Sequence, residues 1–336
     1  MVYVHIPFCK GFCVYCDFFS ELCPDASALR RFGAELCAEA RRRSDEITAS
    51  AAVPTLYFGG GTPSLLPLPV MKEMVAAVVG GPWGEFTVEV NPEDIVTRGA
   101  PYVAGLRALG VNRVSMGVQS LSDDILRWMG RRHNAERARQ AFRLLREGGM
   151  ENLSVDVIFG VPGLSMETLQ ATVEELLTWR PEHLSCYQLS IEEGSALAEQ
   201  LRSGLCAEAP EEDCRAQYDW LCARLRAAGY RHYEISNWAL PGFESRHNSA
   251  YWKRVPYVGL GPGAHSLRIF PDGRQVRSWN SEQLSGWTSE SETLTPDEIR
   301  EESLMLGLRT AEGLPDGRRI PESEWFIADT LISQLL

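Results

Sequence analysis

Residues 2–17 of the chain read VYVHIPFCKGFCVYCD. A short apolar run leads directly into three cysteines, Cys9, Cys13 and Cys16, in the spacing C-x3-C-x2-C. Three thiolates can hold three irons of a 4Fe–4S cluster and leave the fourth iron free for a small ligand. All three sulfurs must come from one compact loop, and Gly11 allows that loop to bend. The spacing therefore predicts an iron–sulfur site with one open iron.

Two other uses of these cysteines stay open on spacing alone. They could belong to a zinc site, or they could simply be buried thiols. A structural zinc site normally has four ligands. The next cysteine is Cys23, and His5 lies before the loop within the apolar run. The iron–sulfur interpretation is favoured because the three cysteines already form a complete set for a cluster.

The composition is that of a globular protein. The chain has 336 residues, of which 44% are hydrophobic and 23% charged, enough for one large α/β domain or a domain with an appendage. The formal net charge is −12. A strongly acidic chain is poorly suited to broad contact with nucleic acid or anionic lipid. We therefore expect no nucleic-acid partner.

The number of cysteines and the hydropathy of the chain indicate its cellular compartment. Nine cysteines, an odd number with three in a tight group, favour metal binding in a reducing environment over a disulfide framework. The first residues lack the basic and long apolar regions of a secretion signal. No stretch approaches the roughly 20 apolar residues of a membrane span. The expectation is a cytoplasmic protein with no integral membrane segment.

Strand and helix patterns alternate along the first 230 residues. This alternation predicts a parallel sheet, either open or rolled into a barrel. The predicted strands are 3–6, 55–58, 86–91, 113–118, 153–159 and 183–189. The predicted helices are 25–43, 101–109, 122–129, 135–146, 166–179 and 211–228.

Polar residues gather where these strands end. In parallel α/β folds the carboxyl ends of the strands form the ligand site. Each residue has a structural alternative, since Glu89 could face solvent and the glycines could form only a tight turn. Their common position favours a ligand site. The residues are Gly60, Gly61, Thr62, Glu89, Asn91, Gln119 and Asp156.

The alternation of strands and helices ends after Gly229. A strand over 230–239 is followed by the sequence HNSAYW, a glycine-rich segment, and a hairpin turn at 271–274. A helix over 296–308 begins a smaller region, and the chain ends in an apolar helical pattern. We predict three parts: a barrel core (1–229), a β-rich segment that completes the barrel (230–290), and the start of a small helical domain (291–336).

Several stretches together resemble radical S-adenosylmethionine proteins. The resemblance is to the group that contains oxygen-independent coproporphyrinogen oxidase and the heme chaperone HemW, and it extends to about Arg309. The stretches are YVHIPFCKGFCVYCDF, YFGGGTPS, VEVNPED, RVSMGVQS, DVIFGVPG, YEISNWA and HNSAYW. The first two of these together are highly specific for this group.

The resemblance implies a fold and a set of cofactor contacts. The fold would be α/β, a partial (β/α)6 TIM-type barrel with a small C-terminal helical extension. The cluster would sit on Cys9, Cys13 and Cys16, and S-adenosylmethionine would chelate its open iron through amino and carboxylate groups. An arginine suits that carboxylate, although Arg132 adjoins the implied Arg131. The implied cofactor contacts are Tyr3, Gly60, Gly61, Thr62, Glu89, Gln119, Arg131 and Asp156.

Two departures favour the HemW branch. The oxidase pattern continues to a fourth cysteine, where this chain has Phe18 after Asp17, and the oxidase has a substantial segment before the cluster strand. The HNxxYW motif of the HemW branch is present as His247, Asn248, Tyr251 and Trp252.

His247 is a candidate heme ligand, since imidazole is a suitable axial ligand and aromatic rings can cover the macrocycle. It could equally be a hydrogen-bonded structural residue. His5, His265, Cys214 and Cys222 stay open as rival ligands.

The resemblance yields one principal function and two alternatives. The principal hypothesis is a heme chaperone that transfers heme to an acceptor such as a respiratory cytochrome, with no catalytic residue assigned and a homodimer left open. The chain stops earlier than this group usually does, so any role of the final domain is in doubt. One alternative is an enzyme acting on a tetrapyrrole, by oxidative decarboxylation of coproporphyrinogen or by methyl transfer to heme. The other is a protein that binds only the cluster.

Overall fold

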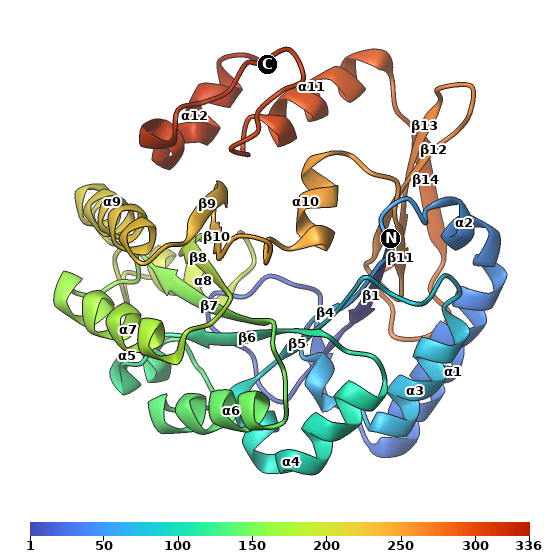
Figure 1. Ribbon diagram of the computed structural model, residues 1–336, viewed down its shortest axis with the longest axis horizontal. Coiled ribbons are helices and arrows are strands. Elements are labelled where there is room, and N and C mark those ends of the chain that lie inside the picture. The colour runs from blue at the N-terminus through green and yellow to red at the C-terminus, as the bar shows by residue number, and fades with distance from the viewer.

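A computed structural model describes all residues, 1–336, and is built around one large sheet (Figure 1). Nine strands form it in the order β11-β1-β4-β5-β6-β7-β8-β10-β9. The six central strands run parallel and follow the predicted positions closely, so the partial-barrel prediction is confirmed. They are β1 (Val2–Ile6), β4 (Thr55–Gly60), β5 (Glu85–Val90), β6 (Arg113–Gln119), β7 (Leu153–Phe159) and β8 (His183–Gln188).

Helices cover the outer face of the curved sheet (Figure 1). The strands are almost continuously apolar because helices bury one face and the barrel interior encloses the other. Side chains such as Val4, Phe58 and Val88 are fully buried. The main covering helices are α1 (Ala26–Arg42), α3 (Leu68–Ala77), α4 (Pro92–Ala108), α6 (Ala135–Glu147), α7 (Met166–Trp179) and α9 (Glu211–Ala227).

Two of the main covering helices differ from the sequence prediction, and the short helices at 44–49, 196–202 and 246–252 were not predicted. The helix expected over 101–109 is the second half of α4, which begins at Pro92 after its capping residue Asn91. Gly99, at φ 66°, interrupts α4 just before Pro101, so the sequence pattern predicts that a new helix begins there. Helix α3 was not predicted, because a proline precedes it and another lies in its first turn.

The strand predicted over 230–239 is wrong as a single element. It is a hairpin of β9 (Arg231–Glu234) and β10 (Asn237–Ala239), with β10 antiparallel to β8. At the other edge of the sheet, β11 (Val258–Leu260) pairs in parallel with β1. The segment after Gly229 therefore supplies strands to both edges of the sheet, while β9 and β11 do not pair with each other.

Smaller elements surround this core. The predicted turn at 271–274 joins β12 (His265–Ile269) to β13 (Gln275–Asn280), and β14 (Ser289–Thr293) completes a three-stranded sheet. A short parallel pair, β2 (Phe8–Cys9) and β3 (Glu21–Leu22), brackets the cysteine loop. The remaining helices are α2 (Ser44–Ala49), η1 (Pro63–Leu65), α5 (Asp123–Trp128), α8 (Ala196–Arg202), α10 (Arg246–Trp252), α11 (Pro296–Gly307), η2 (Glu322–Ile327) and α12 (Ala328–Ser333).

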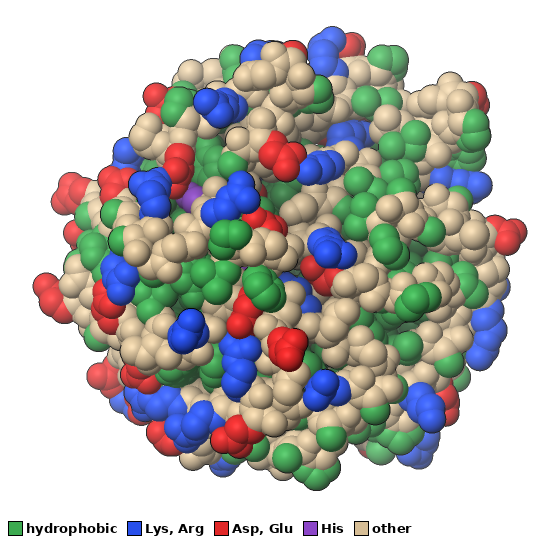
Figure 2. Space-filling view, in the orientation of Figure 1, with side chains coloured by type: hydrophobic (Ala, Val, Ile, Leu, Met, Phe, Trp, Pro, Cys, Tyr) green, Lys and Arg blue, Asp and Glu red, His purple; other side chains and the backbone are tan.

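The C-terminal helices lie beside the β9–β10 edge (Figure 1). Backbone hydrogen bonds from Ile235 to Arg309 and from Ala311 to Tyr233 join the two regions. Acidic and basic side chains are intermixed over the face shown in Figure 2. No helix combines the length and apolar character that crossing a membrane would require.

Candidate functional site

A cavity of about 590 Å³ opens within the barrel toward the carboxyl ends of the parallel strands. Every predicted cluster and cofactor residue except Tyr3 lines it, and so do Phe12, Arg113, Tyr187 and Asn248. The structure thus brings together residues that are spread over 148 positions of sequence, from Cys9 to Asp156. Such convergence of polar groups in one concave site is typical of a ligand site.

The cysteine loop is held in place at its base and tip. At its base, the Cys23 amide donates a hydrogen bond of 2.7 Å to the Cys9 carbonyl, which closes the β2–β3 pair. At its tip, Val14 bonds to Met129 and Leu197 through the backbone. The Cys9 and Cys13 sulfurs lie 3.4 Å from the Thr62 hydroxyl and the Arg131 guanidinium, respectively. All nine cysteines of the chain are free thiols in the structure.

The geometry fits a cluster better than a single zinc ion. The sulfurs of Cys9, Cys13 and Cys16 do not all lie within 4.8 Å of one another, although ligands of one tetrahedral ion must. His5 is not available as a fourth ligand, since its Nδ1 contacts the Tyr3 hydroxyl at 3.0 Å and its Nε2 the Phe19 carbonyl at 3.0 Å. Three separated, half-buried thiols on one loop suit a larger, multi-iron group.

Gly60, the last residue of β4, and Gly61 permit a close approach to this loop. Gly60 has φ 103°, and a Cβ there would lie 2.5 Å from the His5 ring. A Cβ on Gly61 would lie 2.8 Å from the Phe8 carbonyl oxygen. Larger residues would therefore push the glycine turn away from the cysteine loop.

Two carboxylates face the barrel interior. Glu89 accepts hydrogen bonds from the Tyr57 hydroxyl at 2.7 Å and the Gly60 amide at 3.2 Å. Burial raises the pKa of Glu89 to about 7, and Asp156 adds to the effect. Burial likewise raises the pKa of Asp156, which accepts a hydrogen bond of 3.2 Å from Ser115. A cationic ligand would favour the ionised form of both groups.

Gln119 and Arg131 carry polar atoms that no protein group satisfies. Gln119 has φ 66°, at an irregularity in the β6–β7 pairing, and its Oε1 is buried without a hydrogen bond. Arg131 donates to the Gly117 carbonyl at 2.6 Å and contacts Cys13, but its Nε is buried and unpaired. Backbone strain and unsatisfied atoms beside a cavity are typical of a site that binds a ligand.

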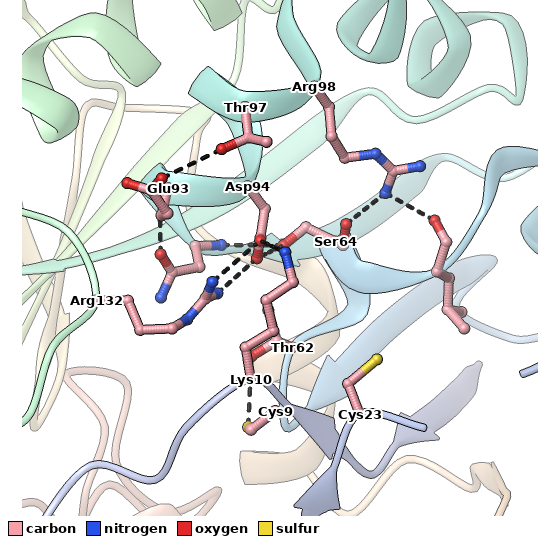
Figure 3. A network of polar contacts seen from close by, with 12 residues as sticks. Cys9, Lys10, Cys23, Thr62, Ser64, Glu93, Asp94, Thr97, Arg98 and Arg132 are labelled. Carbon is pink, nitrogen blue, oxygen red and sulfur yellow. Dashed lines mark hydrogen bonds and ion pairs between the residues drawn. The ribbon is translucent and has the colours of Figure 1, made fainter. Parts of the chain in front are cut away.

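Asp94 is a residue that the sequence analysis did not single out, and it organises the rim of the site (Figure 3). Its carboxylate is 1% exposed and accepts hydrogen bonds from Arg132 at 2.8 Å, Lys10 at 3.3 Å and Ser64 at 3.2 Å. Lys10 follows the first cysteine, and Ser64 follows the glycine turn. The network therefore separates the roles of two adjacent arginines: Arg132 anchors the rim, while Arg131 contacts Cys13.

Two predicted site residues lie outside the cavity lining. Tyr3 supports the site indirectly, through its hydrogen bond to His5. His247 is 1% exposed at the start of α10, with Nδ1 at 2.8 Å from the Thr55 hydroxyl and Nε2 at 3.2 Å from the Tyr251 hydroxyl. Burial lowers the pKa of His247 to about 3. Both ring nitrogens are thus occupied, and the ring packs against Tyr57, which does line the cavity.

Comparisons with known proteins agree with this geometry. Residues 3–176 match the family model described as the radical SAM superfamily. The chain is 36% identical over 334 residues to the heme chaperone HemW of Mycobacterium tuberculosis, covering 94% of this chain and 83% of that protein. It is 34% identical over 332 residues to the heme chaperone HemW of Synechocystis, covering 93% and 78%.

A solved structure shows the same fold. The coproporphyrinogen III oxidase HemN of Escherichia coli, a radical SAM enzyme, matches with a TM-score of 0.74 at 20% identity, covering 92% of this chain and 75% of that one. At this identity the match concerns the fold alone. Together with the family model and the relatives above, it shows that the chain belongs to the radical SAM superfamily, in the family of the proteins named heme chaperone HemW.

Proposed function

We propose that this protein is a heme chaperone that carries a 4Fe–4S cluster and S-adenosylmethionine and transfers heme to an acceptor protein. The relatives named heme chaperone HemW support the proposal, since they are 32–36% identical over more than nine tenths of this chain. The free thiols suit the reducing conditions of the cytoplasm, where we place the protein. The acceptor would be an apoprotein such as a respiratory cytochrome, and a homodimer stays a prediction.

The observation that carries the cofactor part is the cavity with its unsatisfied groups. Cys9, Cys13 and Cys16 would hold the cluster, and Arg131 beside Cys13 would meet a carboxylate. Glu89 and Asp156 would meet the cationic and hydroxyl groups of S-adenosylmethionine. When bound, these cofactors would supply reductive cleavage of a sulfonium. In a chaperone the cluster would control assembly or heme transfer, without turnover of a substrate.

The heme ligand is a separate prediction. His247 is the candidate from the motif, but either its Thr55 or its Tyr251 hydrogen bond must open before a nitrogen can reach iron. His265 is the exposed rival, beside Trp279 on the small sheet. The neutral imidazole that metal binding needs is already favoured at His247, because burial lowers its pKa to about 3.

The same cavity supports a second function. An enzyme acting on a tetrapyrrole would need the same cofactor set, and all its predicted residues except Tyr3 line the cavity here. The two functions differ in turnover. An enzyme forms 5′-deoxyadenosine in proportion to a modified tetrapyrrole, whereas a chaperone returns heme unchanged.

The test is anaerobic. The cluster is reconstituted, heme is titrated while the Soret band is followed, and 5′-deoxyadenosine and tetrapyrrole products are assayed in the same samples. We expect stoichiometric heme binding and transfer to an apocytochrome, with no tetrapyrrole product. Coupled conversion of coproporphyrinogen or heme would contradict the chaperone proposal. Iron and S-adenosylmethionine binding without heme binding would leave a protein that carries only the cofactors.

Three variants decide the ligand in the same assay. Tyr251→Phe frees Nε2 of His247, so heme should bind more tightly if His247 is the ligand. His247→Ala should then remove the effect of the axial ligand on the Soret band, while His265→Ala should leave that band unchanged. The reverse pattern would assign His265.

A further inference from the structure

A second group of metal-ligand side chains lies outside the cavity lining, where α9, β9 and η2 meet. Cys222 comes from α9, His232 from β9, and Glu322 is the first residue of η2. Their ligand atoms all lie within 4.8 Å of one another, and no other trio of histidine, cysteine or acidic residues in the chain meets this condition. The Nδ1 atom of His232 is 3.9 Å from the Cys222 sulfur and 2.9 Å from a Glu322 oxygen.

We propose that Cys222, His232 and Glu322 bind one zinc ion. A thiolate, an imidazole and a carboxylate are the three side-chain ligands that zinc uses in proteins. Soft and borderline donors in this combination disfavour magnesium and calcium, which take oxygen ligands. The observed separations need only small adjustments to surround one tetrahedral ion.

The surroundings of His232 orient it as a metal ligand. Its Nε2 lies 3.4 Å from the Ile235 carbonyl oxygen. When Nε2 carries the hydrogen and donates it to this carbonyl, the lone pair of Nδ1 points toward Cys222 and Glu322. Metal-bound histidines commonly donate their second nitrogen to a carbonyl in this way. The His232 ring stacks on Trp238, with 3.9 Å between the ring centroids, and packs edge to face with Trp325, with 4.4 Å between the centroids. These contacts fix the plane of the imidazole.

Two further groups complete the site. The Tyr218 hydroxyl, one helical turn before Cys222, is buried beside the Cys222 thiol and has no other hydrogen-bond partner. A water molecule in the fourth position of the ion would give it a second partner. Arg226 pairs with the other oxygen of Glu322, so the carboxylate is already oriented and keeps one oxygen for the metal.

The three ligands would join separate parts of the chain. The His232 side chain is only 4% exposed, whereas that of Glu322 is one third exposed. A bound ion would replace the thiol proton of Cys222 and tie the C-terminal η2 to the β9–β10 edge of the main sheet. Its loss should therefore loosen the C-terminal helices and leave the barrel cavity unchanged.

The experiment uses the full chain with its cluster reconstituted, so that iron already occupies Cys9, Cys13 and Cys16. The protein is equilibrated with zinc chloride and desalted, and zinc and iron are counted per chain. We expect one zinc in the wild type and in the control variants Cys206→Ser and His265→Gln. We expect at least roughly tenfold weaker zinc binding in Cys222→Ser and Glu322→Gln, with iron unchanged.

Cobalt is the spectroscopic probe of the same site. A thiolate-to-cobalt absorption should appear in the wild type and in Cys206→Ser, and be absent from Cys222→Ser. Glu322→Gln keeps the assay interpretable if a buried substitution fails to fold, because Glu322 is one third exposed. The proposal is overturned if the wild type retains no zinc, or if zinc persists at wild-type levels in both ligand variants. Neither result bears on heme binding, which the Soret assay measures separately.

Discussion

The cysteine loop and the HNxxYW segment are the two most informative motifs of this chain, and the structure treats their polar atoms in opposite ways. Around the loop, Gln119 and Arg131 present buried atoms without partners to a cavity. In the second segment, both ring nitrogens of His247 are already hydrogen-bonded. The first region is prepared for ligands, whereas the second must rearrange before His247 can bind one.

This difference shows how hydrogen bonding, more than residue type, decides which groups are available. A buried polar atom without a partner costs about 1–3 kcal/mol, so such an atom beside a cavity favours binding of a ligand or water that satisfies it. A buried histidine with two partners stabilises the fold and resists ligation.

The largest effect should come from the cysteine loop. Replacing Cys9, Cys13 or Cys16 by serine should abolish the cluster, because a loop with two thiolates cannot hold three irons. Cys23→Ser is the matched control, since Cys23 adjoins Cys9 but the only hydrogen bond of its thiol goes to the Pro24 carbonyl. Iron content and visible absorption after anaerobic reconstitution measure the result. Equal loss in Cys23→Ser would make the assignment of ligands wrong.

Asp94→Asn should weaken the rim of the site. The change removes the buried charge that Arg132 and Lys10 share, and hydrogen bonds to charged groups are worth about 1.5–3 kcal/mol. We expect a loss of stability of that size in urea unfolding and faster release of iron. Glu93→Gln, on the neighbouring half-buried position, should change stability by less than about 1 kcal/mol. Similar losses in the two variants would show that Asp94 has no special role.

S-adenosylmethionine should bind more weakly as the pH falls below 7. Burial raises the pKa of Glu89 to about 7, so acid protonates the carboxylate that a cationic ligand requires. One pH unit below that value should weaken binding by up to about tenfold. Glu89→Gln should bind weakly at every pH, whereas the cavity-lining variant Glu192→Gln should keep the slope. Calorimetric titration at pH 6 and 8 decides the matter, and a flat profile in the wild type would count against Glu89 as a contact.

His247 should make the fold sensitive to acid. Its pKa is about 3 in the folded protein and about 6.5 when unfolded, so protons favour the unfolded state as the pH falls from 6.5 toward 3. The cost is at most about 1.4 kcal/mol per pH unit. His247→Gln should therefore reduce the difference in unfolding free energy between pH 7 and 5 by roughly 2 kcal/mol.

The control for that measurement is His265→Gln, at an exposed position on β12. Burial lowers the pKa of His265 as well, but the ring is exposed, so this variant should change the acid dependence less than His247→Gln does. An unaltered slope in His247→Gln would mean that His247 is accessible in solution, and the contrast between the two motifs would disappear.

Much of the fold was predictable because local patterns and tertiary packing agree. The strand 153–159 and the helix 166–179 have their predicted bounds, because the apolar residues of each follow one periodicity along its whole length. The pattern misled at 230–239, where a turn at Ile235 and Ser236 carries no glycine or proline. It also missed Asp94, because a carboxylate in a first helical turn usually interacts only with the helix dipole. The division into 1–229, 230–290 and 291–336 stays a prediction.

The sequence by itself determined the parallel α/β architecture, the three cysteines, and the polar residues at the strand ends. These follow from periodicity and spacing along the chain, which are local properties. Only the tertiary structure decided that Arg131 faces Cys13 while Arg132 holds Asp94, that His247 is enclosed, and that Cys222, His232 and Glu322 meet. These depend on contacts between residues distant in sequence, whose distances and burial are set by packing.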